Sequence, residues 1–101
     1  MERAKPYDQR MRDLVGKVDE ILLHEWDPVG VRDNPRAWDE YSSYAPGLLR
    51  FAMRGDVEAV ADRLHRIKHE LMGLRREDRA LDRAVARKIV DLAAGISDPA
   101  P

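Results

Sequence analysis

The chain has 101 residues, of which 18 are basic, 19 are acidic and none is cysteine. A chain of this length builds one domain around one core. Its net charge of −1 provides no bulk field that would attract nucleic acid or an anionic membrane. The lack of cysteine excludes a disulfide framework, a thiolate zinc site and a cysteine nucleophile.

The N-terminal stretch "MERAKPYDQR" is too polar for a secretory signal, and no apolar run approaches the ~18 residues that a membrane helix needs. We therefore expect a soluble, cytoplasmic protein that has no membrane contact.

Apolar residues recur at intervals of three and four along most of the chain, which predicts amphipathic helices, and no strand-like alternation occurs. The predicted fold is all-α: a compact four-helix domain with one long ordered loop between the first and second helices. Pro28 should end the first helix, and Gly55 with Asp56 should separate the second from the third. The predicted helices span 8–26, 46–54, 57–73 and 77–94, and the loop spans 27–44.

The segment "HEWDPVGVRDNPRAWDEYSSYAPG", residues 24–47, holds both tryptophans, two of the three tyrosines and three of the six prolines. Its aromatic side chains argue against disorder because they seek burial. Asp27 is expected to accept backbone N–H bonds in a turn, and Gly30 to adopt a positive φ. Alternatively, Trp26 and Asp27 form the floor of a ligand pocket. The expected structural anchors of the loop are Trp26, Asp27, Pro28, Gly30 and Trp38.

The stretches "WDPVG", "DEY" and "YAPGLLR" resemble a family of small bacterial helical proteins of unknown function that carries a W-D-P-[IV]-G … D-E-Y pattern. The resemblance covers roughly residues 12–74 and is strongest from Trp26 to Gly47. It implies a compact all-α fold with the loop packed against the helices, and it implies no reaction. The fourth helix lies outside the resemblance and is predicted from periodicity alone.

Charge is unevenly distributed along the chain. Residues 19–44 hold seven acidic and two basic residues, a net charge of −5, whereas residues 63–88 hold nine basic and four acidic residues, a net charge of +5. The two regions could dock on each other within the fold, or they could form separate faces for partners.

Glu25 and Lys68 both fall within apolar stripes, which makes them candidates for buried charges. A buried charge must be paired, because leaving it unpaired costs several kcal/mol. Glu25 and Lys68 could pair with each other, Lys68 could pair with Asp27 or Asp39, or the lysine stem could extend to water.

The residues that carry common catalytic chemistries lack their usual surroundings. No Gly-x-Ser-x-Gly elbow surrounds a serine, and no glycine-rich loop is present to hold a phosphate. His65 and His69 lie one helical turn apart, but a zinc site needs a third ligand. The basic run "RREDRALDRAVARK" is interleaved with acids, which indicates an exposed, ion-paired helix. We therefore expect no enzyme activity, no metal or other cofactor, and no nucleic-acid partner.

The favoured hypothesis is a small protein-interaction module, of the kind found among immunity proteins, whose acidic loop binds a basic protein. The adjacent carboxylates of Asp39 and Glu40 could grip an arginine, bind a hard cation, or pair internally. The expected partner-binding residues are Asp33, Arg36, Asp39, Glu40, Tyr41 and Tyr44.

Two further hypotheses remain open. One is a small-ligand or metal-binding protein, a weak hydrolase at most, with a pocket under the loop. The other is self-association of the helices, although we expect a monomer or a weak homodimer. The pocket of the first alternative would be formed by Trp26, Asp27, Asp39, Tyr41 and His65.

Overall fold

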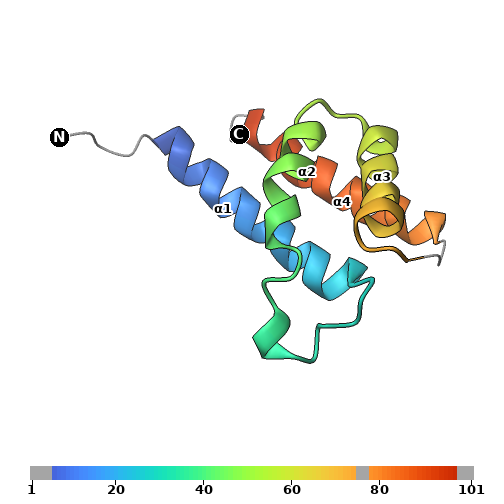
Figure 1. The fold of residues 1–101 in the computed structure, drawn as a ribbon. Helices are drawn as coiled ribbons and strands as arrows, with labels where there is room; N and C mark the ends of the chain where they lie inside the picture. Colours follow the sequence, from blue (N-terminus) through green and yellow to red (C-terminus); the bar gives the residue numbers. More distant parts are fainter. Residues whose placement is uncertain (1–5, 75–77, 98–101) are drawn as a thin grey trace.

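The computed structural model describes residues 6–74 and 78–97, which form an all-α domain as predicted (Figure 1). These residues contain four α-helices and no strand. None of the described helices is both long enough and apolar enough to cross a membrane. The α-helices are α1 (Pro6–Ile21), α2 (Ala45–Ala52), α3 (Val57–Arg66) and α4 (Arg79–Ser97).

The helix ends differ from the predicted ones by a few residues. The first helix begins two residues before residue 8, because Pro6 is tolerated in a first turn. The last helix continues beyond residue 94 to Ser97, and its predicted start at residue 77 lies outside the described residues.

Helices α1 and α3 both end in a five-residue π-helical segment, η1 (Leu22–Trp26) and η4 (Ile67–Leu71). The N–H of Asp27 donates to the carbonyl of Leu22 at 2.8 Å, and the N–H of Met72 donates to that of Ile67 at 3.0 Å. This five-residue spacing is the π-helical pattern, which is rare and frequently found at functional sites. The apolar periodicity predicted uninterrupted helices here, because it does not distinguish a wider last turn from an α-helical one.

The connection between helices α2 and α3 follows from local turn chemistry. Gly55 has a φ of +77°, which a residue without Cβ adopts readily, and the Asp56 carboxylate accepts the N–H of Ala59 at 3.1 Å. Helix α2 therefore ends at Ala52, the chain turns through Gly55, and α3 begins directly after an aspartate cap.

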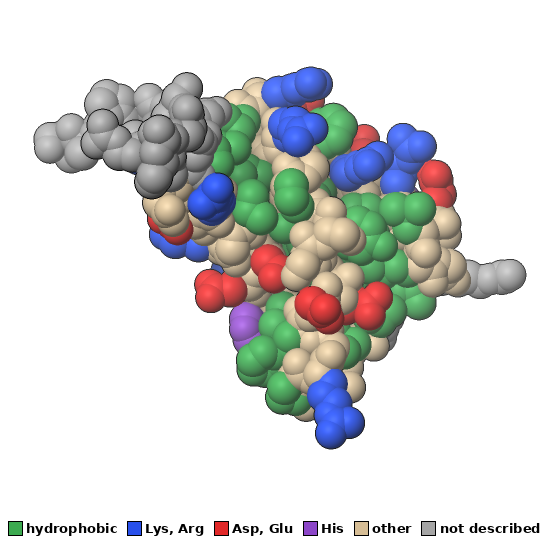
Figure 2. All heavy atoms as spheres, turned by 60° about the vertical axis from the view of Figure 1, so that its left-hand side comes forward, with side chains coloured by type: hydrophobic (Ala, Val, Ile, Leu, Met, Phe, Trp, Pro, Cys, Tyr) green, Lys and Arg blue, Asp and Glu red, His purple; other side chains and the backbone are tan. Residues whose placement is uncertain are grey.

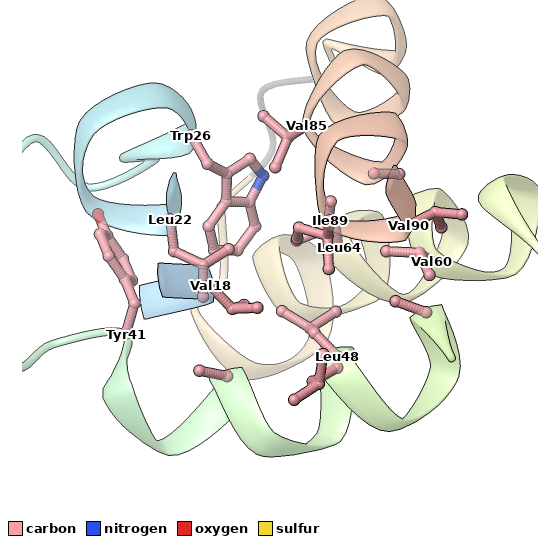
Figure 3. Close-up of a cluster of buried hydrophobic side chains, with 14 of the residues drawn as sticks. Val18, Leu22, Trp26, Tyr41, Leu48, Val60, Leu64, Val85, Ile89 and Val90 are labelled. Carbon is pink, nitrogen blue, oxygen red and sulfur yellow. The ribbon is translucent and has the colours of Figure 1, made fainter. Parts of the chain in front are cut away.

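The hydrophobic core lies where the four helices and η1 meet (Figure 3). The α3–α4 pair has the most extensive contact of any two elements. The segment between η1 and α2 leaves the helical body and forms a separate lobe at one end (Figure 1). It contains two short 3₁₀ helices, η2 (Pro35–Ala37) and η3 (Ser42–Tyr44). Core side chains include Val18, Leu22, Trp26, Tyr41, Leu48, Leu64, Val85 and Ile89.

Candidate functional site

Residues 27–44, hereafter the acidic loop, are held at their base by a hydrogen-bonded pair, Asp27 and Tyr41. The Tyr41 hydroxyl donates to Asp27 Oδ1 at 2.7 Å and accepts the backbone N–H of Val29 at 3.1 Å. The Asp27 carboxylate also accepts the N–H groups of Val31, at 2.8 Å, and Arg32, at 3.1 Å. The two side chains therefore fix the start of the loop to its far end.

The backbone conformation of Asp27 makes this pairing possible. Asp27 has a φ of +34° and a ψ of 58°, in the left-handed region, which aspartate tolerates better than most residues. Gly30, with a φ of +72°, completes the reversal. The chain thus turns sharply after η1, and the Asp27 carboxylate faces the N–H groups of the loop.

Ionisation of both groups responds to this environment. Partial burial disfavours a charged Asp27, but hydrogen bonds from Tyr41 and from two backbone N–H groups outweigh it and hold the pKa of Asp27 below its ordinary value. Burial, followed by the bond to the Asp27 carboxylate, raises the pKa of the Tyr41 hydroxyl far above its ordinary value. A charged aspartate and a neutral tyrosine are therefore the paired forms at neutral pH.

A second set of hydrogen bonds holds the outer part of the loop. The Trp38 indole N–H donates to the Arg32 carbonyl at 2.8 Å, and Arg32 Nη1 donates to the His24 carbonyl at 2.9 Å. The Ser42 hydroxyl donates to Asp19 Oδ2 at 2.9 Å, which ties the loop to α1. The loop is thus bonded to η1 through Arg32 and to α1 through Ser42.

The acids at the tip of the loop have no such partners. Asp33, Asp39 and Glu40 are exposed, and within the described part of the chain their side chains make no hydrogen bond or ion pair. Figure 2 shows one face of the molecule, with acidic side chains across its middle and most basic side chains above them. Below the acidic band, hydrophobic side chains reach the surface of the lobe that contains the loop. Arg36 is also exposed, so the tip keeps a net negative charge.

One of the expected loop roles is wrong. Tyr41 was expected to contact a partner, but it is fully buried, and its ring meets the Trp26 ring edge-on with centroids 5.5 Å apart. Trp38 was expected to anchor the loop, and its N–H does so through the Arg32 carbonyl, although 45% of the residue is exposed. Tyr44 is half-buried against the core, which leaves it little surface for a partner.

A buried ionic cluster lies beneath the loop. Asp82 of α4 is fully buried, and its Oδ1 accepts the Lys68 ammonium at 2.9 Å and the Trp26 indole N–H at 3.0 Å. Lys68, one of the two candidates for a buried charge, is only 3% exposed, so its stem does not extend to water. Its partner, however, is Asp82 and not Glu25, Asp27 or Asp39. The cluster joins η1, η4 and α4 through groups that water does not reach.

Glu25, the other candidate for a buried charge, is not buried. Its side chain is 38% exposed and pairs with Lys88 of α4, which is itself largely exposed. The widened turn of η1 places Trp26 in the core and leaves Glu25 at the surface. This pair connects the acidic region, residues 19–44, with the basic region, residues 63–88. The acids at the loop tip take no part in it.

The rings of His65 and His69 lie with their centroids 4.2 Å apart and their planes tilted by 40°, and His65 Nδ1 lies 3.8 Å from Asp82 Oδ2. Among the residues that the structure describes, no group of three or more histidine, aspartate or glutamate side chains is arranged to hold a metal ion. His65 thus lies beside the buried cluster, with His69 next to it.

A small pocket lies between the loop base and the buried cluster. About 300 Å³ of space, part of it open to solvent, is available there. Of the residues expected around a pocket, Trp26 and Asp27 line it, whereas Asp39, Tyr41 and His65 do not. The lining residues are Trp26, Asp27, Pro28, Lys68, Asp78 and Leu81.

Sequence reasoning missed Asp82, although its position carried a signal. Val85, Ala86 and Ile89 of α4 are buried, and Asp82 lies three, four and seven residues before them, on the same helical face. A carboxylate in that stripe needs a buried partner, and Lys68 was the cation already identified as intruding on an apolar face.

Comparisons of the chain with protein-family models, with curated proteins and with solved structures give no match.

Proposed function

We propose that this protein is an interaction module that binds a basic protein through the tip of its acidic loop. One observation carries the proposal: Asp33, Asp39 and Glu40 are exposed and without ion partners in the described structure, on a loop that internal hydrogen bonds hold in place. A preorganised loop loses little conformational entropy when it binds. Carboxylates that no internal cation neutralises are free to attract a basic partner.

An immunity-type role is the particular form that we favour, in which the chain neutralises a basic toxin. Such a role requires a small, stable, charged surface and no catalytic group. The exposed Trp38 beside the acids adds a residue type that often dominates interface energies.

The test is isothermal titration of the purified chain with proteins encoded beside its gene. The loop variant carries Asp33→Asn, Asp39→Asn and Glu40→Gln. We expect it to bind the partner at least about tenfold more weakly, because charges at the contact are lost.

A matched control removes three acids elsewhere, with the same change in net charge: Asp13→Asn, Glu70→Gln and Asp91→Asn. These residues are exposed and lie on α1, η4 and α4. We expect the control to bind within about twofold of the unmodified chain, since distant exposed charges are screened. Equal weakening by both variants, or no binding by any of the neighbouring proteins, would overturn the proposal.

A second candidate function, small-ligand binding, is favoured by the pocket at the loop base. Lys68 is one of its lining residues, and its ammonium has three N–H donors, for which the described residues supply one acceptor, Asp82. A small ligand that carries a hydrogen-bond acceptor would complement the remaining donors. Thermal-shift screening of small carboxylates and amides tests this function. It would be supported if one of these compounds stabilises the unmodified chain but not the Leu81→Trp variant.

A further inference from the structure

The exposed indole of Trp38 is the feature of the acidic loop that charge alone does not explain. Tryptophan is mostly buried in folded proteins, yet 45% of this side chain is exposed. Its N–H is already bonded to the Arg32 carbonyl at 2.8 Å, so a partner cannot use that donor. What remains for a partner is the aromatic ring, and the hydrogen bond fixes its orientation.

Within the described chain, no arginine or lysine lies over this ring. The cation–π contacts among the described residues are those of Arg54 and Arg63 with Phe51, at 5.5 and 5.9 Å from the ring centroid. The neighbouring Arg32 directs Nη1 to the His24 carbonyl.

We infer that the acidic loop recognises an arginine side chain of its protein partner, which stacks on Trp38 while Asp39 or Glu40 accepts its N–H groups. This inference rests on the proposed function and specifies its partner chemistry. Tryptophan is the best aromatic partner for a cation, and arginine is found over such rings more often than lysine. A guanidinium also offers a planar fork of donors that matches a carboxylate, whereas an ammonium acts as a point charge.

The discriminating experiment compares two fluorescently labelled peptides of equal charge, hexa-arginine and hexa-lysine, by fluorescence anisotropy at low ionic strength. We expect the full chain to bind hexa-arginine about fivefold to tenfold more tightly than hexa-lysine. Trp38→Leu, which keeps an apolar side chain without a π face, should reduce this preference to about twofold or less. Trp38→Phe should give an intermediate preference.

Folding of each variant is checked by circular dichroism and thermal unfolding, and we expect Trp38 variants to fold because this ring lies outside the core. Equal affinity for the two peptides, a preference that persists in Trp38→Leu, or binding of neither peptide would each overturn the inference. The two peptides could also bind equally, with binding of both lost when Asp33, Asp39 and Glu40 are neutralised. In that case the arginine preference fails while the proposed function stands. The proposed function itself is tested separately, by the isothermal titration with the proteins encoded beside the gene.

Discussion

At the scale of single residues, Asp27 and Tyr41 explain why a segment rich in turn-forming residues is ordered. Their bond joins two positions fourteen residues apart in the sequence, and the aspartate also accepts two backbone N–H groups. The Tyr41 ring fills the core against Trp26, so the polar contact is held by apolar packing. The loop owes its shape to these side chains and not to regular secondary structure.

Tyr41→Phe should destabilise the protein by about 1–3 kcal/mol, because it leaves Asp27 Oδ1 and the Val29 N–H without their hydroxyl partner. Chemical denaturation measures the loss. Tyr44→Phe is the matched control: the Tyr44 hydroxyl makes no hydrogen bond within the described residues, so a change within about 0.5 kcal/mol is expected. Equal losses for the two variants would contradict the assigned role of Tyr41.

The lowered pKa of Asp27 predicts a dependence of stability on pH. A carboxyl whose pKa is lower in the folded state stabilises the fold above its unfolded pKa, and this contribution is lost as pH falls through the folded value. For Asp27 the loss should therefore occur below the unfolded value of 3.8. Unfolding of the native chain and of Asp27→Asn, compared from about pH 7 to about pH 2.5, should show the stability difference shrinking in this acidic range. A difference that is constant with pH would contradict the prediction.

Turn chemistry in the sequence predicted part of this arrangement. An aspartate followed by proline and glycine indicated a turn in which the aspartate side chain accepts backbone N–H bonds. Asp27 and Gly30 form such a turn. The direction in which Tyr41 and Trp38 point was not predictable in this way. Both are aromatic residues in a polar loop, and only the position of the core relative to the loop determines which one is buried.

At the scale of secondary-structure elements, the two π-helical ends meet on α4. Segment η1 contributes Trp26 and η4 contributes Lys68, and both side chains bond Asp82 Oδ1. A buried ion pair of this kind adds little net stability, because desolvation offsets the attraction, but removing one partner is costly. The cluster therefore specifies how the ends of α1 and α3 dock on α4.

Lys68→Met should destabilise the protein by about 3–5 kcal/mol, because it leaves the Asp82 carboxylate buried and unpaired. The control Lys88→Met removes the exposed partner of Glu25 and should cost no more than about 1 kcal/mol. Thermal and chemical unfolding give both values.

A double variant separates loss of the charge pair from loss of packing. Adding Asp82→Asn to Lys68→Met removes the uncompensated charge while keeping an acceptor for Trp26. The double variant should lose less stability than the sum of the two single variants. Strict additivity would show that the two groups do not act as a pair.

The apolar periodicity predicted the number and order of the helices, because each helix buries one face. It did not predict the pairing of Lys68 with Asp82, since the two residues lie on different helices and their approach depends on how those helices cross. The sequence did identify Lys68 as a charge in an apolar stripe, and Asp82 meets the same criterion in α4. Pairing each charged residue in the apolar stripe of one helix with an opposite charge in the apolar stripe of another would have predicted the Lys68–Asp82 pair.

At the scale of the whole molecule, the acidic and basic regions of the sequence are joined only in part. Glu25 pairs with Lys88, and the exposed bases Arg79 and Arg83 pair with acids of α3. The acids of the loop tip take no part in these pairs within the described structure. The charge of the loop tip is therefore directed outward, as its proposed role requires.

Association with a basic partner should depend strongly on ionic strength. Raising it from about 0.05 to about 0.5 M should slow association about tenfold, because salt screens the attraction between exposed charges. Dissociation should change much less, since it reflects close contacts such as those of Trp38. Stopped-flow or surface-plasmon measurements separate the two rates, and an association rate insensitive to salt would count against steering by the loop.

Recognition by the acidic loop is tested most directly by an amide chemical-shift titration of the isotopically labelled chain with hexa-arginine. We expect perturbed signals from residues 32–41 and from the Trp38 indole N–H, while signals of α3 and of the Trp26 indole stay unchanged. Perturbations centred on α3 or α4, or spread evenly over the molecule, would contradict the claim that an ordered acidic loop is the recognition surface.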